Sequence, residues 1–321
     1  MRLFVTGGAG YIGSVVAAKL LEAGHRVTVF DDLSTGHREL VPRGARFVQG
    51  DLLDRAALWS ALSEGFDAIL HFAAKSLVGE SAEKPIFYFG TNIGGAVHLL
   101  DAMREASIAT IVFSSTAAVY GEPESVPIPE EAAARPGNPY GASKLAIDQL
   151  LGFAARAHGS TAVSLRYFNV GGAYGAQGER HMPETHLIPR VLLAASRDEA
   201  IDVYGTDYET PDGTAIRDYV HVADLADAHL LALEGGKPGE HRIYNLGNGE
   251  GFSVREVLAV ARRVTKKPIP ENPRPRRAGD PARLVAASEK ARRELGWRPR
   301  RSELERIVRD AWAFMTNGVA R

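Results

Sequence analysis

The amino-acid sequence predicts an α/β protein built on a doubly wound parallel sheet, followed by a smaller α/β region. Two observations lead to this prediction. Short apolar runs alternate with amphipathic stretches through the first half of the chain, and a glycine-rich turn joins the first run to the first stretch. Such alternation is typical of parallel strands that are covered by helices on both faces of the sheet.

The apolar runs predict the strands of this sheet because they are short, rich in β-branched and aromatic residues, and separated by polar turns. In chain order they are RLFVT (2–6), RVTVF (26–30), ARFVQ (45–49), DAILHF (67–72), TIVFS (110–114) and AVSLRYF (162–168). Helical periodicity between the runs predicts helices over residues 12–23, 54–64, 85–107 and 140–158.

The pattern loosens after Asn169 into the polar stretch GGAYGAQGERHMPETH, which places a domain boundary near residue 170. We expect a first domain over residues 1–170 and a second over residues 171–321. The segments near 216–247 contain a further strand and helix in IRDYVHVADLADAHLLAL and a short strand in RIYNLG. These segments are predicted to return to the first domain.

The chain has 321 residues, a formal net charge of −1 and no cysteine. The absence of cysteine excludes disulfides, thiolate metal sites and cysteine nucleophiles. A net charge near zero gives no general attraction to nucleic acid or to a membrane, so we expect neither as a partner. No apolar run approaches the roughly 20 residues of a spanning helix, and the N-terminus carries no signal-peptide pattern. These features predict a cytoplasmic enzyme.

The glycine-rich turn TGGAGYIG (6–13) lies between the first predicted strand and the first predicted helix. Gly7 would permit the tight turn, Gly10 would let the backbone approach a pyrophosphate, and Gly13 would let the helix pack closely on the strand. The helix N-terminus would offer unpaired amide groups and the positive end of its dipole to the phosphates. The turn therefore predicts a Rossmann-type dinucleotide site.

Asp31 ends the second predicted strand, where a carboxylate can accept hydrogen bonds from an adenosine ribose. Asp31 and Asp32 would repel a 2′-phosphate, and no arginine follows them directly. NAD is therefore the expected cofactor, in preference to NADP.

Two later strand ends supply further candidates. Asp51 and Leu52 follow the third strand and could hold adenine, although Asp51 could equally be the N-cap of the next helix. The segment HFAAKS (71–76) follows the fourth strand, and its small residues would let the backbone pass close to a cofactor. His71 itself is expected to be a core histidine.

Tyr140 and Lys144 in NPYGASK lie four residues apart at the start of a predicted helix, hence on one face. A nearby ammonium and a positively charged nicotinamide would stabilise the phenolate, so the tyrosine could act as a base near neutral pH. The hydroxyl residues Ser114 to Thr116 end the fifth strand. All these features converge on the C-terminal edge of one parallel sheet, where such folds bind ligands.

These motifs resemble those of the extended short-chain dehydrogenase/reductase family, and the likeness covers nearly the whole chain. The segments that match epimerases of this family are, in order, GGAGYIGS, DDLSTGH, HFAA, SSTAAVYG, NPYGASK, RYFN, IRDYVHVADLADAH and RRAGDPA. The resemblance implies that the first domain binds NAD and that the second mainly binds a UDP-sugar. It also implies a homodimer in which the helices near 85–107 and 140–158 form a bundle between subunits.

The resemblance further implies interconversion of UDP-glucose and UDP-galactose through a transient 4-keto sugar and NADH. Tyr140 would remove the proton of the sugar 4-hydroxyl while hydride passes from carbon 4 to NAD, and the hydride would then return to the other face of the rotated sugar. Thr116 would hydrogen-bond the reacting oxygen. Lys144 would hold the nicotinamide ribose and lower the pKa of the tyrosine.

Two alanines after Thr116 bear on the reaction type. Relatives that dehydrate nucleotide sugars carry an acid pair just after the corresponding threonine, and decarboxylases of the family commonly have a glutamate nearby. Ala117 and Ala118 occupy these places here. The keto intermediate could therefore only receive its hydride back.

The resemblance also implies two sets of binding residues. The cofactor contacts would be Gly7, Gly10, Tyr11, Ile12, Gly13, Asp31, Asp32, Leu33, Ser34, Thr35, Gly36, Asp51, Leu52, Phe72, Ala73, Ala74, Ser76, Asn92, Ser114, Tyr140, Lys144 and Phe168. The UDP-sugar contacts would be Thr116, Tyr140, Asn169, His186, Leu187, Asp202, Val203, Tyr204, Arg217, Arg277 and Asp280.

Within the second set, the resemblance gives each group of residues a role. The segment 202–204 would frame the uracil, Asp280 would hold a ribose hydroxyl, and Asn169 would meet the diphosphate. Arg217 and Arg277 would pair with the diphosphate through their forked guanidinium groups. Two positions depart from many relatives, which have lysine in place of Ser76 or asparagine in place of His186. Lys75 is the alternative contact for the nicotinamide ribose.

Other interpretations of these residues stay open. Arg217 could form a surface ion pair with the adjacent Asp218, and the arginines around 274–283 could be a solvated face. The segment ERHMPETH is expected to be a polar loop and not a metal site, because the histidines show no tight ligand spacing with carboxylates. The arginine-rich RPRRAGDPAR is short and lacks the interleaved aromatic residues of a nucleic-acid site.

Two alternatives to the leading function also remain. The substrate could be another UDP-sugar, carrying an N-acetylhexosamine, a pentose or a uronate. A non-catalytic NAD-binding sensor is the other alternative, but such a protein would usually have lost Tyr140 or Lys144, and both are present.

Overall fold

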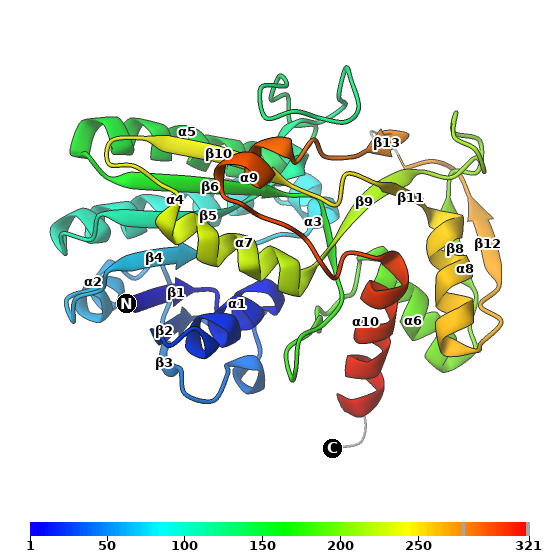
Figure 1. The fold of residues 1–321 in the computed structure, drawn as a ribbon, viewed down its shortest axis with the longest axis horizontal. Helices are drawn as coiled ribbons and strands as arrows, with labels where there is room; N and C mark the ends of the chain where they lie inside the picture. Colours follow the sequence, from blue (N-terminus) through cyan, green and yellow to red (C-terminus); the bar gives the residue numbers. More distant parts are fainter. Residues whose placement is uncertain (278–279, 319–321) are drawn as a thin grey trace.

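A computed structural model describes residues 1–277 and 280–318 of the chain (Figure 1). Its main feature is a seven-stranded sheet with the strand order β10-β6-β5-β4-β1-β2-β3, in which every neighbouring pair is parallel. The strands are β1 (Arg2–Thr6), β2 (Arg26–Asp31), β3 (Arg46–Gln49), β4 (Ala68–His71), β5 (Thr110–Thr116), β6 (Thr161–Tyr167) and β10 (His241–Leu246). The predicted α/β class with a doubly wound parallel sheet is confirmed.

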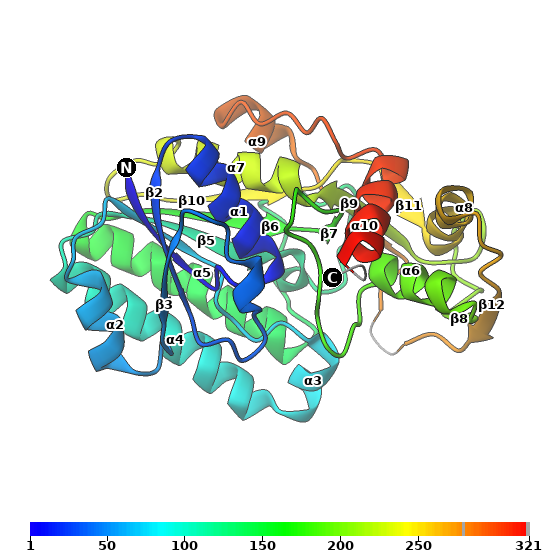
Figure 2. The same cartoon turned by 90° about the horizontal axis from the view of Figure 1, so that it is seen from below.

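Helices cover both faces of this sheet, as Figure 2 shows. One apolar core joins the strands to α1 and α7, and a second core on the opposite face joins them to α2, α4 and α5. The helices are α1 (Tyr11–Glu22), α2 (Arg55–Leu62), α3 (Val78–Glu83), α4 (Pro85–Glu105), α5 (Pro139–His158) and α7 (Val222–Glu234). No helix within residues 1–277 and 280–318 is long and apolar enough to cross a membrane.

Local sequence signals explain where α5 and α2 begin and end. The side chain of Asn138 accepts a hydrogen bond from Gly141 N at the start of α5, and Gly159 ends the helix at φ 70°. In α2 the N-cap is Asp54, whose carboxylate accepts from Ala57 N at 3.0 Å. The N-cap alternative for Asp51 is therefore wrong, because the helix begins three residues later than that alternative requires.

The rest of the chain builds a smaller region beside the carboxyl ends of the main strands (Figure 1). Its strands are β7 (Asn169–Gly171), β8 (Ile201–Tyr204), β9 (Ile216–His221), β11 (Gly251–Ser253), β12 (Glu271–Arg274) and β13 (Arg283–Leu284). Strand β9 pairs with β7, β11 and β13, while β8 pairs with β12. The helices of this region are α6 (Leu187–Arg197), α8 (Val254–Thr265) and α10 (Leu304–Gly318), which share one apolar core. Helix α9 (Glu289–Glu294) instead packs on β10 at the edge of the main sheet.

The segments near 216–247 divide between the two regions. Strand β10 pairs with β6 at the edge of the main sheet, and α7 packs on α1, whereas β9 belongs to the smaller region. The division into domains at residue 170 stays a prediction.

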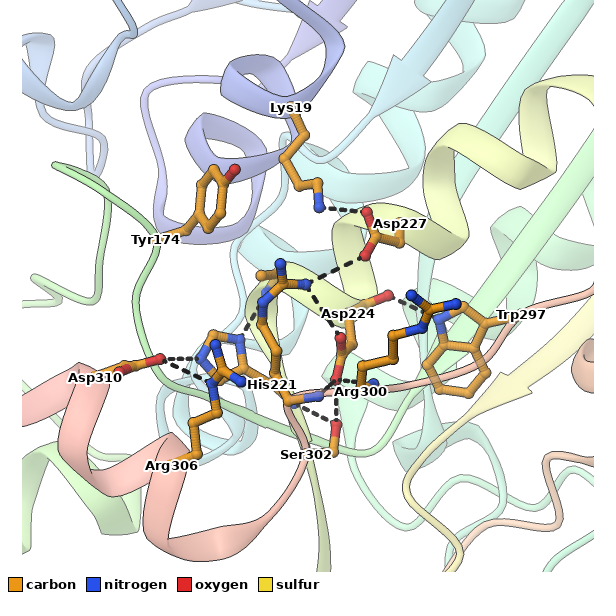
Figure 3. Close-up of polar contacts among 12 residues, drawn as sticks. Lys19, Tyr174, His221, Asp224, Asp227, Trp297, Arg300, Ser302, Arg306 and Asp310 are labelled. Carbon is orange, nitrogen blue, oxygen red and sulfur yellow. Dashed lines mark hydrogen bonds and ion pairs between the residues drawn. The ribbon is translucent and has the colours of Figure 1, made fainter. Parts of the chain in front are cut away.

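A buried carboxylate at the start of α7 fastens the last part of the chain to the main sheet (Figure 3). Asp224 is 1% exposed. Its Oδ2 accepts from the backbone N of Arg300 at 3.0 Å and of Arg301 at 2.6 Å, and from Ser302 Oγ at 3.0 Å. The indole N–H of Trp297 donates to the Asp224 carbonyl oxygen at 2.8 Å. These bonds satisfy Oδ2 and the backbone carbonyl oxygen of Asp224. Oδ1 has no hydrogen-bond partner among the described residues and lies 3.6 Å from the Arg301 guanidinium.

The same network continues to the neighbouring helices α10 and α1 (Figure 3). His221 N donates to Ser302 Oγ at 3.0 Å, and His221 Nε2 lies 3.1 Å from Asp310 Oδ2 in α10. On the other side, Lys19 of α1 pairs with Asp227 of α7. One set of polar contacts thus links α1, α7 and α10.

The fully buried His229 in α7 should make the protein sensitive to acid. Its Nε2 lies 2.7 Å from Tyr167 Oη and its Nδ1 lies 2.9 Å from the Leu225 carbonyl oxygen. Burial lowers the pKa of His229 to about 4. Because the unfolded histidine titrates near 6.5, the unfolded state binds more protons below that pH, so stability is fully present above pH 6.5 and is lost toward pH 4.

We expect this residue alone to remove about 2 kcal/mol of unfolding free energy between about pH 6.5 and pH 4.5. Urea denaturation across this range should show a smaller loss for His229→Gln than for the wild type. His158→Gln, at an exposed position, is the control and should follow the wild type. Equal pH slopes for His229→Gln and wild type would contradict the assignment.

Candidate active site

A cavity of about 430 Å³ opens at the carboxyl edge of the main sheet, between the strand ends and the smaller region. The structure brings most of the predicted residues to its wall. These are Gly7, Gly10, Tyr11, Ile12, Gly13, Asp31, Asp32, Ser34, Thr35, Gly36, Asp51, Leu52, Phe72, Ala73, Ala74, Ser76, Ser114, Thr116, Tyr140, Lys144, Phe168, Asn169, His186 and Arg217. Parts of the chain that are more than 200 residues apart thus meet at one site. This agrees with the prediction that the ligands bind at the carboxyl ends of the parallel strands.

The other predicted binding residues do not line this cavity. They are Leu33, Asn92, Leu187, Asp202, Val203, Tyr204, Arg277 and Asp280. Asn92 instead holds the loop after β4, because its Oδ1 accepts from Lys75 N at 2.8 Å and its Nδ2 donates to Ser143 Oγ at 3.0 Å. The Arg277 guanidinium lies 4.0 Å from the centre of the Tyr204 ring, at the end of β8. Their predicted ligand contacts stay predictions.

The glycine turn has the shape that a dinucleotide needs. Gly7 has φ 71°, and a Cβ there would collide with the backbone of Phe72 and Ala73 in the next strand-end loop. A Cβ on Gly13 would collide with the backbone of Gly7. Helix α1 begins after Gly10 with no side-chain cap and no acidic residue in its first turn. The first amide groups of α1 are therefore free to bind a phosphate, so the cavity fits NAD.

Asp31 and Asp32 give the adenosine end of this cavity its negative charge. Asp31 is buried and accepts from Ala9 N and Leu33 N, each at 2.9 Å. Burial raises the pKa of its carboxyl, and these hydrogen bonds oppose the rise. Asp32 accepts from Ser34 N at 2.8 Å. Two carboxylates in the loop after β2, where the adenosine ribose would lie, are consistent with NAD and would repel a 2′-phosphate.

In the loop after β4, Lys75 does not lie where the alternative contact for the nicotinamide ribose would be. Lys75 Nζ lies 2.8 Å from Ser34 Oγ, in the loop after β2, so it does not point along the cavity toward Tyr140. His71 is buried, as expected of a core histidine, with Nδ1 2.7 Å from Thr6 Oγ1. Its Nε2 has no hydrogen-bond partner among the described residues.

Tyr140, Lys144 and Thr116 meet at the other end of the cavity. Lys144 Nζ lies 6.0 Å from the centre of the Tyr140 ring and donates to the Ser114 carbonyl oxygen at 2.8 Å. Burial lowers the pKa of Lys144 to about 7, and the charge of Asp148 opposes this fall. Burial also raises the pKa of Tyr140, while a hydrogen bond with the Thr116 side chain lowers it. The resemblance implied that Lys144 lowers the pKa of Tyr140, but in this structure burial is the largest effect on that pKa and raises it.

Asp148 is a residue of this site that the sequence analysis missed. It lies one turn after Lys144 on the buried face of α5, and its Oδ2 accepts from Arg166 Nε at 3.0 Å and from Ser115 Oγ at 3.1 Å. A buried ion pair therefore lies directly behind the lysine. The available signal was an acidic residue on the apolar face of a predicted helix, four positions after Lys144.

Arg217 reaches the cavity from β9, and it does not form the surface ion pair with Asp218 that the sequence left open. Its guanidinium pairs with Asp280 and donates to the Ile216 carbonyl oxygen at 2.8 Å. Asp218 is fully buried and instead accepts backbone hydrogen bonds from Asn248 and other residues. The proposed Arg217 to Asp218 ion pair is wrong, because neighbouring side chains on a strand point to opposite faces.

The segment ERHMPETH was predicted to be a polar loop and not a metal site, but in the structure it brings four potential metal ligands together. Glu179, His181, Glu184 and His186 each place one potential ligand atom within 4.8 Å of the others. Glu179 and His181 line the cavity and were not predicted to do so. Their spacing in the chain matches no familiar ligand motif, so only the folded loop brings them together.

A buried phenol and a buried amine lie on successive turns of one helix, beside a cavity that fits a dinucleotide. Such a pair can move a proton, and a nicotinamide bound in the cavity would supply hydride transfer. The protein is an enzyme of the extended short-chain dehydrogenase/reductase class. More narrowly, the chain belongs to the NAD dependent epimerase/dehydratase family, whose sequence model matches residues 3–247.

Curated relatives and solved structures agree with this membership. The chain is 56% identical over 316 residues to a UDP-glucose 4-epimerase of Corynebacterium glutamicum, covering 98% of this chain and 95% of the relative. It is 58% identical over 318 residues to a UDP-glucose 4-epimerase of Streptomyces lividans, with the same coverage. A crystal structure of UDP-glucose 4-epimerase from Brucella ovis in complex with NAD is 46% identical, with a TM-score of 0.93 and 98% of both chains covered.

Proposed function

We propose that the protein is an isomerase that interconverts UDP-glucose and UDP-galactose by inverting carbon 4 of the hexose, with NAD as its cofactor. The near full-length relatives named as UDP-glucose 4-epimerases support this reaction. The observation that carries it in the structure is the pair Ala117 and Ala118, which lines the cavity beside Thr116. Neither side chain can donate or accept a proton, so the site has no group there for eliminating water from a keto sugar.

Tyr140 is the base in this proposal. It takes the proton of the 4-hydroxyl and later returns it, and the side chain of Thr116 is placed to hydrogen-bond both the phenol and the reacting oxygen. NAD, when bound, would supply a reversible hydride acceptor for carbon 4 of the sugar. The sugar is thus oxidised and reduced in turn, with no net redox change.

The protonation states of the site depend on charge that the chain alone does not provide. Burial disfavours both the phenolate of Tyr140 and the ammonium of Lys144. Asp148 behind the lysine favours the ammonium, and a positively charged ring against the tyrosine would favour the phenolate. Lys144 can therefore hold a ribose hydroxyl while the cofactor activates the tyrosine.

Arg217 is the best placed group for the diphosphate of the UDP-sugar. Its guanidinium lines the cavity and is held by Asp280 at its outer side. A forked guanidinium binds a diphosphate through two hydrogen bonds. In this proposal Asn169 adds a polar contact, and the uracil lies toward β8, where Tyr204 and Arg277 stack.

Assays of the purified protein against a set of UDP-sugars test this function. We expect turnover of UDP-galactose to UDP-glucose without net consumption of added NAD. Turnover of a UDP-N-acetylhexosamine, UDP-pentose or UDP-uronate in the absence of UDP-galactose turnover would favour the second candidate. Net formation of NADH would instead indicate a dehydrogenase.

A homodimer and a cytoplasmic location, both inferred from the sequence, also stay proposals. Helices α4 and α5 lie side by side and expose large apolar residues, with Ile86 88% and Phe153 66% exposed. Such a face would be covered if it formed a bundle with a second copy. Light scattering should then give twice the mass of one chain.

A further inference from the structure

The loop between β7 and α6 gathers two histidines and two glutamates into one cluster. Glu179, His181, Glu184 and His186 lie in a stretch of eight residues, and one potential ligand atom from each lies within 4.8 Å of the others. His186 Nδ1 lies 3.0 Å from Glu184 Oε1 and 3.7 Å from Glu179 Oε2. His181 Nδ1 contacts Glu179 Oε1. Both imidazoles therefore turn the same ring nitrogen toward the carboxylates.

The carboxylates of this cluster are buried and incompletely paired. The side chains of Glu179 and Glu184 are only 10% and 9% exposed. Glu179 Oε1 and His181 Nδ1 are buried and contact each other as an ion pair, and neither has a hydrogen-bond partner among the described residues. Buried polar atoms in native proteins are nearly always paired. Two buried carboxylates this close also repel one another unless a cation, either a protonated imidazole or a metal ion, lies between them.

We propose that Glu179, His181, Glu184 and His186 bind one divalent transition-metal ion of the zinc type. Two imidazole nitrogens and two carboxylate oxygens form a ligand set that suits Zn²⁺, whereas Mg²⁺ and Ca²⁺ prefer oxygen ligands alone. Around one tetrahedral Zn²⁺ such atoms lie about 3.3 Å apart. All four ligand atoms already lie within 4.8 Å of one another, so the more distant ones must approach and the contacting pair Glu179 and His181 must move apart to reach this arrangement.

The cluster is also placed to position the wall of the active-site cavity. Glu179, His181 and His186 line the cavity, and His186 directly precedes α6. On the other side, His37 Nε2 lies 3.0 Å from the Arg180 carbonyl oxygen. An ion bound here would fix the loop between the adenosine side of the cavity and the start of α6.

The charge of the ion has a further consequence, which rests on the proposed function. The cavity would hold the diphosphates of both NAD and a UDP-sugar, and the carboxylate of Glu179 at its wall, with that of Glu184 close behind, would repel these anions. A divalent cation cancels the charge of both carboxylates. Removing the ion should therefore raise the KM for the UDP-sugar more than it lowers kcat.

Metal binding itself is tested without measuring turnover. Untagged protein is stripped with EDTA, titrated with Zn²⁺ in competition with a chromophoric chelator, and assayed for metal by mass spectrometry and for its melting temperature. We expect one Zn²⁺ per chain and a melting temperature that rises with Zn²⁺. His181→Asn and Glu184→Gln should each lose at least tenfold in affinity. The control His158→Asn, at an exposed position, should bind as the wild type does.

Each protein is compared with and without Zn²⁺, so a change in the basal stability of a variant does not affect the result. Mg²⁺ and Ca²⁺ should leave the melting temperature unchanged. The proposal is overturned if the wild type does not retain Zn²⁺, if His181→Asn binds it as tightly as the wild type, or if Mg²⁺ binds equally well. Because none of these readouts needs turnover, a failure of the site is distinguishable from a failure of the proposed epimerase function.

Discussion

Replacing Tyr140 with phenylalanine should slow epimerisation by about 10²–10⁴-fold, the usual contribution of a positioned base. The substitution removes the one phenol oxygen that faces the Thr116 side chain, while the ring still fills the buried space. NAD should stay bound, because the glycine turn and Asp31 hold the other end of the cofactor in this proposal. The measurement is the initial rate with UDP-galactose, together with the NAD content of the purified protein.

Tyr174→Phe is the matched control for this experiment. Tyr174 loses the same oxygen, but its hydroxyl donates to Glu22 and does not line the cavity. Its rate should stay near that of the wild type. A Tyr140→Phe enzyme with an unchanged rate would show that another group takes the proton.

Replacing Gly7 with alanine should abolish NAD binding and destabilise the fold. Gly7 has a positive φ, which costs an alanine about 1–2 kcal/mol. The added Cβ would also collide with backbone atoms of Phe72 and Ala73, which no side-chain rotation can relieve. Overpacking of this kind typically adds about 1–3 kcal/mol, so we expect a total loss of about 2–5 kcal/mol. Urea denaturation and the content of bound NAD measure the two effects.

A Gly24→Ala variant separates the free-energy cost of the collision from the cost of the positive φ. Gly24 also has a positive φ, but a Cβ there would meet nothing within 4 Å. Gly24→Ala should therefore lose only the conformational part and should keep NAD. If Gly7→Ala were no less stable than Gly24→Ala, the close approach of the two loops would not be a constraint.

The main sheet could be predicted from the sequence because most of its strands are buried on both faces, the edge strand β3 being only half-buried. Such strands appear as continuous apolar runs, and every predicted run became a strand within one or two residues of its expected ends. The smaller region offered no such signal. Strand β12 has the sequence ENPR, with charged residues and a proline, and it is a strand only because it pairs with β8. Strand β13 is two residues long.

The same limit applies to the site. The glycine turn and the pair Tyr140 and Lys144 are local patterns, so the sequence was enough to propose them. Arg217 forms an ion pair with Asp280, which is 63 positions away in the sequence, so this contact could be found only from the fold. The pKa of Tyr140 depends on how deeply the phenol is buried, which the spacing from Lys144 does not disclose.

The contacts of Asp224 have a consequence for the order in which the protein can be completed during synthesis. Helix α7 packs on α1, yet among the described residues every partner of its buried carboxylate lies in residues 300–302. Strand β10, the outermost strand beside β6, also comes late in the chain. Domains usually fold as units while the chain emerges from the ribosome. Here the packing around α7 cannot be completed until residues 300–302 have been made.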